Sequence, residues 1–446
     1  MEIKEFQKTV IEKAKKRGFE DCEIYYQGGE SFQIYVNNGE VEQYETSECS
    51  GAAFKGVING KTGFAYSERF DEVAADFIVK SAIENADIDE NTESEIFYSG
   101  GEYEKIKLYN DELDSVSVNE KINKAKDLEK AAISFSEKVR TVDRCIYGDD
   151  KSTVSIMNTR GLDAQYSTNS MVAYASVICA EDDDIKTGSD FVCGNDFNKF
   201  DAVSLGKKIA EETEKHLGAK SIKSGKYNVV FKNSAMSDVL ATFSDSFSAE
   251  QAFKGLSMLE GKENKKIASD YVTIRDDALL ENGYASAIFD GEGVPCENKA
   301  VVENGILTTF LYDLKYAAKA GKKSTGNGFR AGFKSPVSVG CTNFYIAKGS
   351  NSFDNAIKAV ENGVLITDVE GLHAGANPVS GDFSLSAEGF LIENGKISAP
   401  IEQITVAGNF FKIIEGIKLV ADDLKFGMNG VGAPSVLIEN ISISGL

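Results

Sequence analysis

The chain of 446 residues has little histidine, little positive charge and no long apolar segment. It holds two histidines, and its 48 basic residues face 70 acidic ones, which gives a net charge of −22. An acidic surface repels phosphate backbones and anionic lipid headgroups, and no basic cluster offsets it, so the sequence predicts neither nucleic-acid binding nor membrane binding. The longest mostly apolar run, MVAYASVICA at 171–180, has about half of the roughly 20 residues that a membrane-spanning helix needs.

The N-terminus and the cysteines both indicate a cytoplasmic protein. MEIKEFQKTVIEKAKKRGFE at 1–20 carries charges throughout and lacks the apolar core of a secretory signal. The seven cysteines are scattered and contain no C-x-x-C pair, a pattern typical of reduced, buried thiols. The sequence therefore predicts neither a disulfide framework nor a zinc knuckle.

Length and hydrophobic pattern predict an α+β protein of three units. The chain exceeds the roughly 250–300 residues at which a single core stops growing. Residues 1–105 are interpreted as an N-terminal helix followed by an antiparallel meander, 106–222 as a central α+β unit, and 223–446 as a large, antiparallel, barrel-like β-rich domain. The acidic, weakly patterned stretch 84–115 is interpreted as the connection between the first two units.

Helical periodicity marks five segments of the chain. Apolar residues repeat at helical spacing near 3–14, 70–85, 122–139, 205–217 and 233–255. Glycines at positions 18 and 218 follow the first and fourth segments, where glycine commonly ends a helix. In the second segment, the predicted inner face comprises Phe70, Val73, Phe77, Ile78 and Ala82.

Turn signals predict hairpins in both halves of the chain. Asn38-Gly39 and Asn59-Gly60 supply the two positive φ angles that a two-residue hairpin loop requires. Glu-Asn-Gly recurs at 303–305, 361–363 and 393–395. These repeated turns indicate a large antiparallel sheet in the C-terminal half.

A polar, glycine-rich block, EGLHAGANPVSGDFSLSAEGF at 370–390, holds His373, Asn377 and Asp382. Gly375 and neighbouring glycines allow unusual backbone angles and close approach of another chain segment. Two interpretations stay open: a loop beside a free strand edge that captures an extended peptide by main-chain pairing, or a structural turn inside a barrel. A lone histidine in such a turn is more often a hydrogen-bonded structural residue than a metal ligand.

Cysteine and paired carboxylates offer another route to catalysis. Cys296 would act as a nucleophile only with a base beside it. Acid pairs arise by chance in a chain with 70 acidic residues. Three pairs would serve as acid and base only if they faced one cavity with unequal pKa values: Asp276 with Asp277, Asp290 with Glu292, and Asp422 with Asp423.

Five stretches spread over the chain carry a family resemblance. They are YNVVF at 227–231, FDGEGVP at 289–295, VENGILTTFLYD at 302–313, STGNGFR at 324–330, and the block from GLHAGANPVSGDFSLSAEGF to VADDL at 371–424. Together with the helix-then-meander start, they resemble the TldD/PmbA family over nearly the whole chain, and within it the PmbA branch, also called TldE. The resemblance implies the scaffold of zinc peptidases that trim unfolded peptides. Active members of that family place metal ligands in an H-E-x-x-x-H helix and in a cysteine near the C-terminus.

Those family ligands are missing from the matching positions. The corresponding helix, NSAMSDVLATFSDSFSAEQAFKG at 233–255, has no histidine or cysteine, whether the motif falls at 240–245 or at 244–249. The stretch FGMNGVGAP at 426–434 has no cysteine, and the last cysteine of the chain is Cys341. Because a catalytic zinc site needs about three protein ligands, the sequence predicts no metal and no cofactor in this chain.

The resemblance therefore implies a TldE-like, non-catalytic subunit of a cytosolic zinc metallopeptidase that processes unfolded peptides. The zinc is expected in a TldD-like homologue, which would join this chain in a heterodimer; the other arrangement is a homodimer of this chain. Two further hypotheses stay open, a stand-alone homodimeric protein that binds peptides or small molecules without catalysis and a metal-free hydrolase. The predicted substrate-binding residues are Glu292, His373, Gly375, Asn377 and Asp382.

Overall fold

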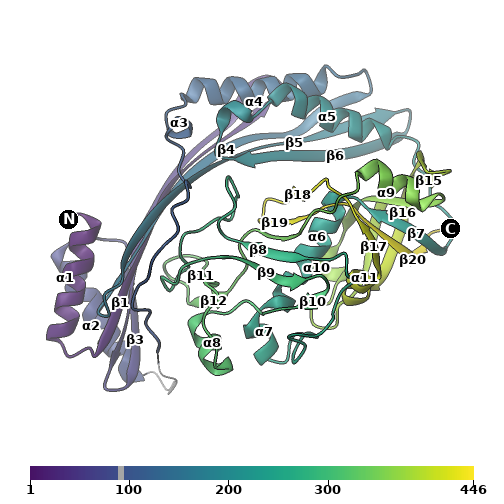
Figure 1. The fold of residues 1–446 in the computed structure, drawn as a ribbon. Coiled ribbons are helices and arrows are strands. Elements are labelled where there is room, and N and C mark those ends of the chain that lie inside the picture. Colours follow the sequence, from purple (N-terminus) through teal and green to yellow (C-terminus); the bar gives the residue numbers. More distant parts are fainter. Residues whose placement is uncertain (89–94) are drawn as a thin grey trace.

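A long curved sheet and a β-rich C-terminal body make up the molecule, whose computed structural model describes residues 1–88 and 95–446 (Figure 1). Six antiparallel strands in the order β3-β2-β1-β4-β5-β6 form the sheet, which arches over the C-terminal body. The strands before and after position 106 thus share one sheet, because β1 pairs with β4. The strands are β1 (Asp21–Asn37), β2 (Glu40–Ile58), β3 (Lys61–Ser67), β4 (Val139–Asn158), β5 (Asp163–Glu181) and β6 (Asp184–Gly194).

Helices cover the two ends of the convex face of this sheet (Figure 1). At one end, α1 buries Phe6 and Val10 in an apolar cluster with Ile24 of β1 and Phe54 of β2. At the other end, α4 begins at a capping box in which Ser117 and the residue three positions on exchange hydrogen bonds. The helices of this half are α1 (Ile3–Lys16), α2 (Glu72–Ile88), α3 (Asp111–Asp114), α4 (Val118–Ile133) and α5 (Ala202–Lys215), with a 3₁₀ turn at Phe197–Lys199.

The face that α2 buries agrees in part with the predicted one. Ile78 and Ala82 are buried as predicted and Phe70 packs against the same core, whereas Val73 and Phe77 are exposed. The other buried residues of α2 are three alanines and one valine. Gly63 of β3 lies so close that a Cβ there would come within 2.1 Å of the Ala82 carbonyl oxygen. Small side chains therefore let this helix approach the sheet backbone at Gly63, and the side chains of Val73 and Phe77 fall outside the contact.

The predicted helix at 233–255 is divided by a strand-like contact. Its parts are α6 (Asn233–Phe243), a 3₁₀ turn (Ser244–Phe247) and α7 (Ala249–Phe253). The main chain of Leu311 accounts for the break, because its N–H donates to Phe247 and its carbonyl accepts from Ala249. A pattern of apolar residues does not reveal such a tertiary interruption.

The C-terminal body contains a closed five-stranded barrel and a second six-stranded sheet. The barrel runs β16-β15-β14-β7-β20, and pairing of β16 with β20 closes it. The predicted α+β class and the barrel-like C-terminal region are confirmed. The barrel strands are β7 (Gly225–Phe231), β14 (Gly363–Glu370), β15 (Asp382–Glu393), β16 (Lys396–Asn409) and β20 (Val436–Ser444), with β17 (Ile417–Val420) beside β20.

The second sheet has the order β10-β9-β8-β13-β19-β18, and a large apolar core containing most of α6 joins it to the barrel. No helix in the ranges 1–88 and 95–446 is long and apolar enough to cross a membrane. The sheet strands are β8 (Ile274–Asp277), β9 (Asn298–Glu303), β10 (Ile306–Leu307), β13 (Phe344–Ile346), β18 (Lys425–Phe426) and β19 (Val431–Ala433). The remaining elements are β11 (Gly328–Arg330), β12 (Val337–Val339), α8 (Leu314–Ala320), α9 (Phe353–Val360), α10 (Leu372–Gly375) and α11 (Phe410–Gly416).

The predicted Asn-Gly hairpins are confirmed by their backbone angles. Asn38 and Gly39 have φ of 53° and 75°, and the turn at 59–60 repeats this pattern with 52° and 73°. The turns at 304–305 and 394–395 also have two positive φ angles. The third Glu-Asn-Gly is different, because there Glu361 takes the positive φ of 56° and the turn joins α9 to β14.

The segment 95–110 runs without regular secondary structure between the two parts of the molecule (Figure 1). The carbonyl of Tyr98 accepts a hydrogen bond from Asn158 of the long sheet (2.7 Å). The hydroxyl of Tyr103 donates to the carbonyl of Gly293 in the C-terminal body (2.8 Å). The predicted connection at 84–115 includes residues 89–94, which lie outside the described residues.

Buried and half-buried ion pairs fix the C-terminal body against the sheet. Arg330 Nη2 lies 3.3 Å from Glu23 Oε1, and the two side chains are 2% and 4% exposed. The guanidinium group also lies 4.8 Å from the ring centre of Tyr25. Lys186 of β6 and Glu402 of β16 form a second pair at 2.7 Å. These contacts hold the two parts of the molecule in one arrangement.

Candidate functional site

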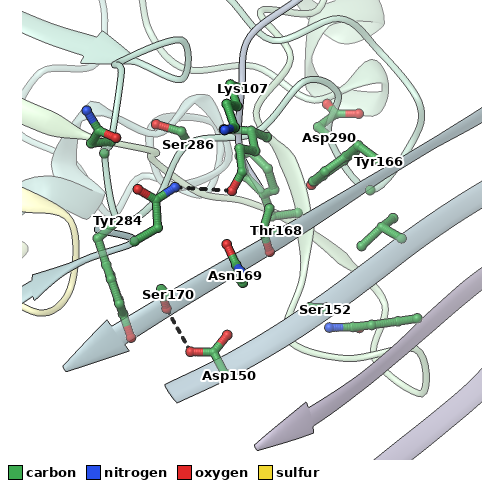
Figure 2. A pocket seen from close by; sticks show the side chains of 18 of the residues that line it. Lys107, Asp150, Ser152, Tyr166, Thr168, Asn169, Ser170, Tyr284, Ser286 and Asp290 are labelled. Carbon is green, nitrogen blue, oxygen red and sulfur yellow. Dashed lines mark hydrogen bonds between the residues drawn. The ribbon is translucent and has the colours of Figure 1, made fainter. Parts of the chain in front are cut away.

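A cavity of about 330 Å³ lies between the concave face of the long sheet and the C-terminal body. Strands β1, β4 and β5 supply one wall and the segment around 107–108 a second. The loop at 282–291 and residues 329–330 of β11 supply a third. Figure 2 shows polar side chains of these walls around one space, with Lys107 near one end of the view and Asp150 near the other. Ligand pockets usually measure about 300–1,000 Å³, so this cavity suits a small ligand.

Several polar side chains on the cavity wall have no hydrogen-bond partner among the described residues. The Oε1 of Gln27 is buried and accepts no hydrogen bond. The hydroxyls of Tyr25, Ser152, Tyr166 and Thr168 are likewise not engaged by another described side chain or main-chain group. Burial raises the pKa of Tyr25 to about 12, so its hydroxyl stays protonated at neutral pH. The Gln27 Oε1 is closed off from the cavity space, whereas the four hydroxyls are not among the buried atoms without a partner. The hydroxyls therefore give this wall hydrogen-bonding capacity that the fold does not use.

Two opposite charges line the cavity without pairing to each other. Lys107 is exposed and forms no ion pair or hydrogen bond within the described ranges. Asp150 accepts a hydrogen bond from the Ser170 hydroxyl (2.7 Å), and burial raises its pKa. Arg330 lines the same cavity but is held by Glu23 and by the carbonyl of Gly291. The wall thus offers one available ammonium group and one carboxylate without a cation beside it.

The loop from 371 to 382, which the sequence marks as a candidate site, is a self-contained turn. The Oδ1 of Asn377 accepts hydrogen bonds from the N–H groups two and three residues further on (3.0 and 3.3 Å). The Asp382 carboxylate accepts hydrogen bonds from Asn409 and from the Ser380 hydroxyl, each at 2.9 Å. These two bonds lower the pKa of Asp382, and the bond from Asn409 has the larger effect. The polar side chains of this loop are therefore engaged in holding its shape.

His373 and Gly375 have different roles in the same loop. His373 is exposed, and no hydrogen bond or ion pair joins it to another described residue. The expectation of a hydrogen-bonded histidine was therefore wrong. Gly375 lies against β15, where a Cβ would come within 2.4 Å of the Ser384 carbonyl oxygen. Glycine is required here by this close approach of the two backbones.

The free strand edge predicted beside this loop does not exist among the described strands. β15 pairs with β16 on one side and, from Ser386 to Ile392, with β14 on the other. Before Ser386, Ala376 bridges to Phe383 and covers the remaining part of that edge. Of the two open interpretations, the structure favours the structural turn inside a barrel over pairing of a peptide with a free edge. Alternation in a sequence reveals a strand but does not reveal that a barrel closes around it.

Glu292 lies in a buried acidic turn of the C-terminal body. It is 6% exposed, and its carboxylate accepts a hydrogen bond from the N–H of Leu314 at the start of α8 (2.8 Å). Burial, followed by the charge of Asp290, raises the pKa of Glu292 well above its usual value. Asp290, on the cavity wall, accepts three main-chain hydrogen bonds. No contact in the described ranges joins Glu292 to the loop at 371–382, so the five predicted substrate residues fall in two separate places.

Helix α6 and the stretch at 426–434 lie side by side, as a shared metal site would require. The Ser237 hydroxyl accepts a hydrogen bond from the N–H of Ala433 (2.8 Å) and lies 3.1 Å from the Lys425 carbonyl oxygen. Further along α6, Leu240 is fully buried in the apolar core. Within residues 1–88 and 95–446, no three histidine, cysteine, aspartate or glutamate side chains are grouped to hold a metal ion.

Three family models match successive parts of the chain. Residues 22–86 match domain 1 of the PmbA/TldA metallopeptidases, 111–217 match the central domain, and 224–445 match the C-terminal domain. TM0727 of Thermotoga maritima MSB8, whose name associates it with modulation of DNA gyrase, is 34% identical. Its crystal structure superposes with a TM-score of 0.92 over 99% of this chain and 100% of that one. The chain belongs to the PmbA/TldD metallopeptidase family.

Two further relatives of this PmbA/TldD family member agree with that assignment. A protein of Methanothermobacter thermautotrophicus named metalloprotease is 25% identical over 433 residues, which cover 92% of each chain. The structure of TldE from Thermococcus kodakarensis superposes with a TM-score of 0.92 over 99% of this chain and 100% of that one. At 22% identity, this second likeness shows the fold alone.

The zinc of active PmbA/TldD family peptidases does not fit the residues that this member places there. Positions 240–245 hold leucine, alanine, threonine, phenylalanine, serine and aspartate, and 426–434 hold no cysteine, histidine or acid. Asp245 is exposed beyond the end of α6. Zinc binding in proteins needs three or four nitrogen, sulfur or carboxylate donors. One carboxylate does not meet that need, and no step of catalysis is assigned to a metal in this chain.

The other catalytic candidates of the sequence are held in structural contacts. Cys296 is 2% exposed, its Sγ lies 3.2 Å from the Gly326 carbonyl oxygen, and burial raises its pKa well above the usual value. A buried thiol with a raised pKa is a poor nucleophile. Asp276 is fully buried and lies 3.0 Å from the Lys299 ammonium group. Asp423 accepts two hydrogen bonds from Ser435.

Apart from Asp290, which the sequence offered as one half of an acid pair, the cavity residues were not predicted from the sequence. A weak signal exists, since DDKST at 149–153 and STNS at 167–170 place polar residues on both faces in the middle of long strands. A strand that packs against a core on one face carries apolar residues there. Consecutive polar residues in mid-strand therefore indicate a stretch with no apolar core on either face.

Proposed function

We propose that this chain is the non-catalytic, TldE-like subunit of a cytosolic zinc metallopeptidase that processes unfolded peptides. A TldD-like homologue would carry the zinc ligands and the catalytic groups. The proposal depends on one observation: a full-length PmbA/TldD scaffold has apolar and hydroxyl side chains on α6 where metal ligands are needed. The net charge of −22 supports a peptide rather than a nucleic acid as the ligand of the assembly.

The predicted substrate residues enter this proposal with unequal roles. His373 would contact a peptide directly, because it is exposed and its imidazole is not held by another described residue. Asn377, Asp382 and Gly375 would shape the loop that presents it. Glu292 would act only indirectly, by supporting the turn that places Asp290 on the cavity wall.

Isolation of the native assembly tests the proposal. The tagged chain is expressed in its own host, recovered by affinity purification, and analysed by mass spectrometry and elemental analysis. We expect a TldD-like homologue in about equal amount, zinc in the complex, and cleavage of a labelled unfolded peptide by the complex only. Purified alone, the chain should hold no stoichiometric zinc. One metal ion per isolated chain, lost in His373→Ala, or peptide cleavage by the isolated chain, would contradict the proposal.

A second function, favoured by the unpaired polar groups of the cavity, is that of a stand-alone homodimeric binding protein. It would bind peptides or small molecules without catalysis. Light scattering on the material recovered from the native host separates the two candidates. A homodimer with no co-purifying homologue supports the second function and excludes the first.

A further inference from the structure

The cavity wall presents two charges that the protein leaves apart. If the Lys107 ammonium and the Asp150 carboxylate were close enough, they would form an ion pair, yet none joins them in the described part of the chain. The other charged groups on the wall, Arg330 and Asp290, are already engaged, by Glu23 and by three main-chain N–H groups respectively. One positive and one negative group therefore remain for a ligand.

We propose that this cavity binds a small zwitterion, an amino acid or a short peptide with free ends, whose carboxylate faces Lys107 and whose ammonium group faces Asp150. This assignment rests on the proposed function in taking peptides as the ligand class. It adds a binding site in the subunit that lacks the metal ligands, formed by the long sheet and the C-terminal body together.

Charge complementarity selects a zwitterion over ligands with one charge. Hydrogen bonds between ionised partners are stronger than those between neutral groups. A simple anion would be attracted by Lys107 but repelled by Asp150. A simple cation would be attracted by Asp150 but repelled by Lys107. Only a ligand that carries both charges at separate ends satisfies both residues at once.

The uncharged part of the wall fits the amide groups of a short peptide. The side-chain amide of Gln27 lies on this wall, and its NH₂ group can donate a hydrogen bond to a ligand carbonyl. The hydroxyls of Ser152 and Thr168 can donate to a ligand carbonyl. The cavity of about 330 Å³ is near the lower end of the usual range for ligand sites, which favours one to three residues over a long chain.

Isothermal titration calorimetry on the full-length chain, without partner, tests this site. The probes are alanyl-alanine with free ends, its N-acetylated form, its C-amidated form and the doubly blocked form. Free alanine and tetra-alanine show the preferred length. The variants are Lys107→Ala and Asp150→Asn. Their matched controls are Lys105→Ala, two positions along the same segment, and Asp143→Asn on the same strand β4, both exposed and off the cavity wall.

We expect the free dipeptide to bind, and each blocked end to weaken binding by about tenfold or more. Lys107→Ala should weaken binding of the free dipeptide by the same factor as amidation of the ligand does in the parent chain. The variant and the parent chain should bind the amidated form with equal affinity. Asp150→Asn should match the effect of acetylation in the same way, and the two controls should bind as the parent chain does. Thermal unfolding of each variant shows that it is folded.

Two outcomes would overturn the site: no heat of binding with any free-ended probe up to millimolar concentration, or equal affinity for the free and the doubly blocked dipeptide. Both are independent of the proposed function, because a TldD-like partner and its zinc can be recovered from the native host whether or not the isolated chain binds a dipeptide. Conversely, if the isolated chain binds the dipeptide but no partner co-purifies with it from the native host, the site is supported and the subunit role is excluded.

Discussion

The loop at 371–382 and the cavity beneath the long sheet are both polar, but they differ in what their polar groups contact. In the loop, Asn377 and Asp382 bond to neighbouring residues of the C-terminal body. In the cavity, Gln27 and several hydroxyls have no partner in the described structure, and Lys107 is unpaired. The loop looks like a site in the sequence and behaves as architecture, whereas the cavity gives little signal in the sequence and has free binding capacity.

This difference indicates how to distinguish a binding site from a structural polar cluster. A polar residue that completes a turn stabilises the fold, because removing it leaves main-chain groups without partners. A polar residue without a protein partner contributes little to the fold, and its removal changes only what the cavity binds. Substitutions of the bonded loop residues should therefore lower stability and leave ligand affinity unchanged. Substitutions of the unpaired cavity residues should lower ligand affinity and leave stability unchanged.

The largest effect on stability is expected for a cavity residue that is already paired. Arg330→Met removes the cation beside Glu23, whose side chain is 4% exposed, and leaves that carboxylate buried without its partner. We expect a loss of about 3 kcal/mol in the free energy of unfolding in urea at pH 8. Burial raises the pKa of Glu23, so protonation should reduce the loss at pH 5.

Arg160→Met is the matched control for this prediction. Its ion pair with Asp21, at 2.7 Å, is solvent-exposed, with side chains 47% and 26% accessible. Its loss should cost less than about 1 kcal/mol. Equal losses in the two variants would show that the buried pair does not hold the C-terminal body against the sheet.

A smaller loss of stability is expected in the loop. Asn377→Ala removes the side-chain acceptor of two main-chain N–H groups and should cost about 1 kcal/mol in thermal or urea unfolding. Dipeptide affinity should not change, because this residue is not on the cavity wall. His373→Ala, in the same loop but without a hydrogen bond to a described residue, should shift stability by less than about 0.5 kcal/mol. A stable Asn377→Ala variant with weakened dipeptide binding would reverse the assignment of the two regions.

Sequence patterns captured the elements of this fold better than their contacts. Asn38-Gly39 predicted a hairpin because two positive φ angles are a local requirement, and the structure has them. The exposure of Val73 and Phe77 on α2 was missed because the position of this helix depends on Gly63, in a strand that precedes it in the chain. The interpretation with a free edge at β15 failed for the same reason, since barrel closure is a long-range property. The cavity escaped prediction because Gln27 and Asp150 lie more than a hundred positions apart and meet only across the sheet.

A third polar region, at the junction of α5 with the barrel, should make stability depend on pH. His216 Nδ1 lies 3.8 Å from Glu388 Oε1 and makes no hydrogen bond. Burial lowers the pKa of His216 to about 4, so its imidazole is neutral at pH 7 and the two groups are not an ion pair. Burial, followed by the charges of Asp368, Glu370 and Glu402, raises the pKa of Glu388 to about 7, against the opposing charge of the lysine at position 186.

Glu388→Gln should remove a destabilising carboxylate charge at high pH. Between the usual glutamate pKa of 4.5 and about 7, folded Glu388 keeps a proton that the unfolded chain has lost, so its contribution to stability falls as pH rises. His216 acts in the opposite direction below pH 6.5, because the unfolded chain takes up a proton that the folded state resists. Since the Glu388 side chain is 36% exposed, screening limits the gain in Glu388→Gln to about 1 kcal/mol at pH 8.

Urea unfolding at pH 4.5 and pH 8 measures this difference. The gain should largely vanish at pH 4.5, where folded Glu388 is protonated and the unfolded chain is half protonated at this site. Glu415→Gln is the control, because Glu415 is exposed on α11 and has no ion pair with another described residue. A gain in Glu388→Gln that is equal at both pH values would show that packing rather than ionisation causes it.

The smallest effect on stability is expected for Gln27, and the buried Gln7 is its comparison. Gln7 of α1 is fully buried, its side-chain amide donates to the carbonyls of Ile24 and Ser155, and its Oε1 accepts from the Ser155 hydroxyl. Gln27 has a buried Oε1 that accepts nothing. Gln7→Leu should cost about 1–3 kcal/mol, because it leaves buried carbonyls without a donor.

Gln27→Leu should change the free energy of unfolding by no more than about 0.5 kcal/mol, since no protein group loses a partner. It should nevertheless weaken the binding of alanyl-alanine several-fold in calorimetry, because the ligand carbonyl loses the side-chain NH₂ donor on the cavity wall. Gln7→Leu, measured in the same way, should bind the dipeptide as the parent chain does. If Gln27→Leu lost as much stability as Gln7→Leu, the Gln27 side chain would be part of the architecture, and the distinction between a cavity open to a ligand and a loop closed on itself would fail.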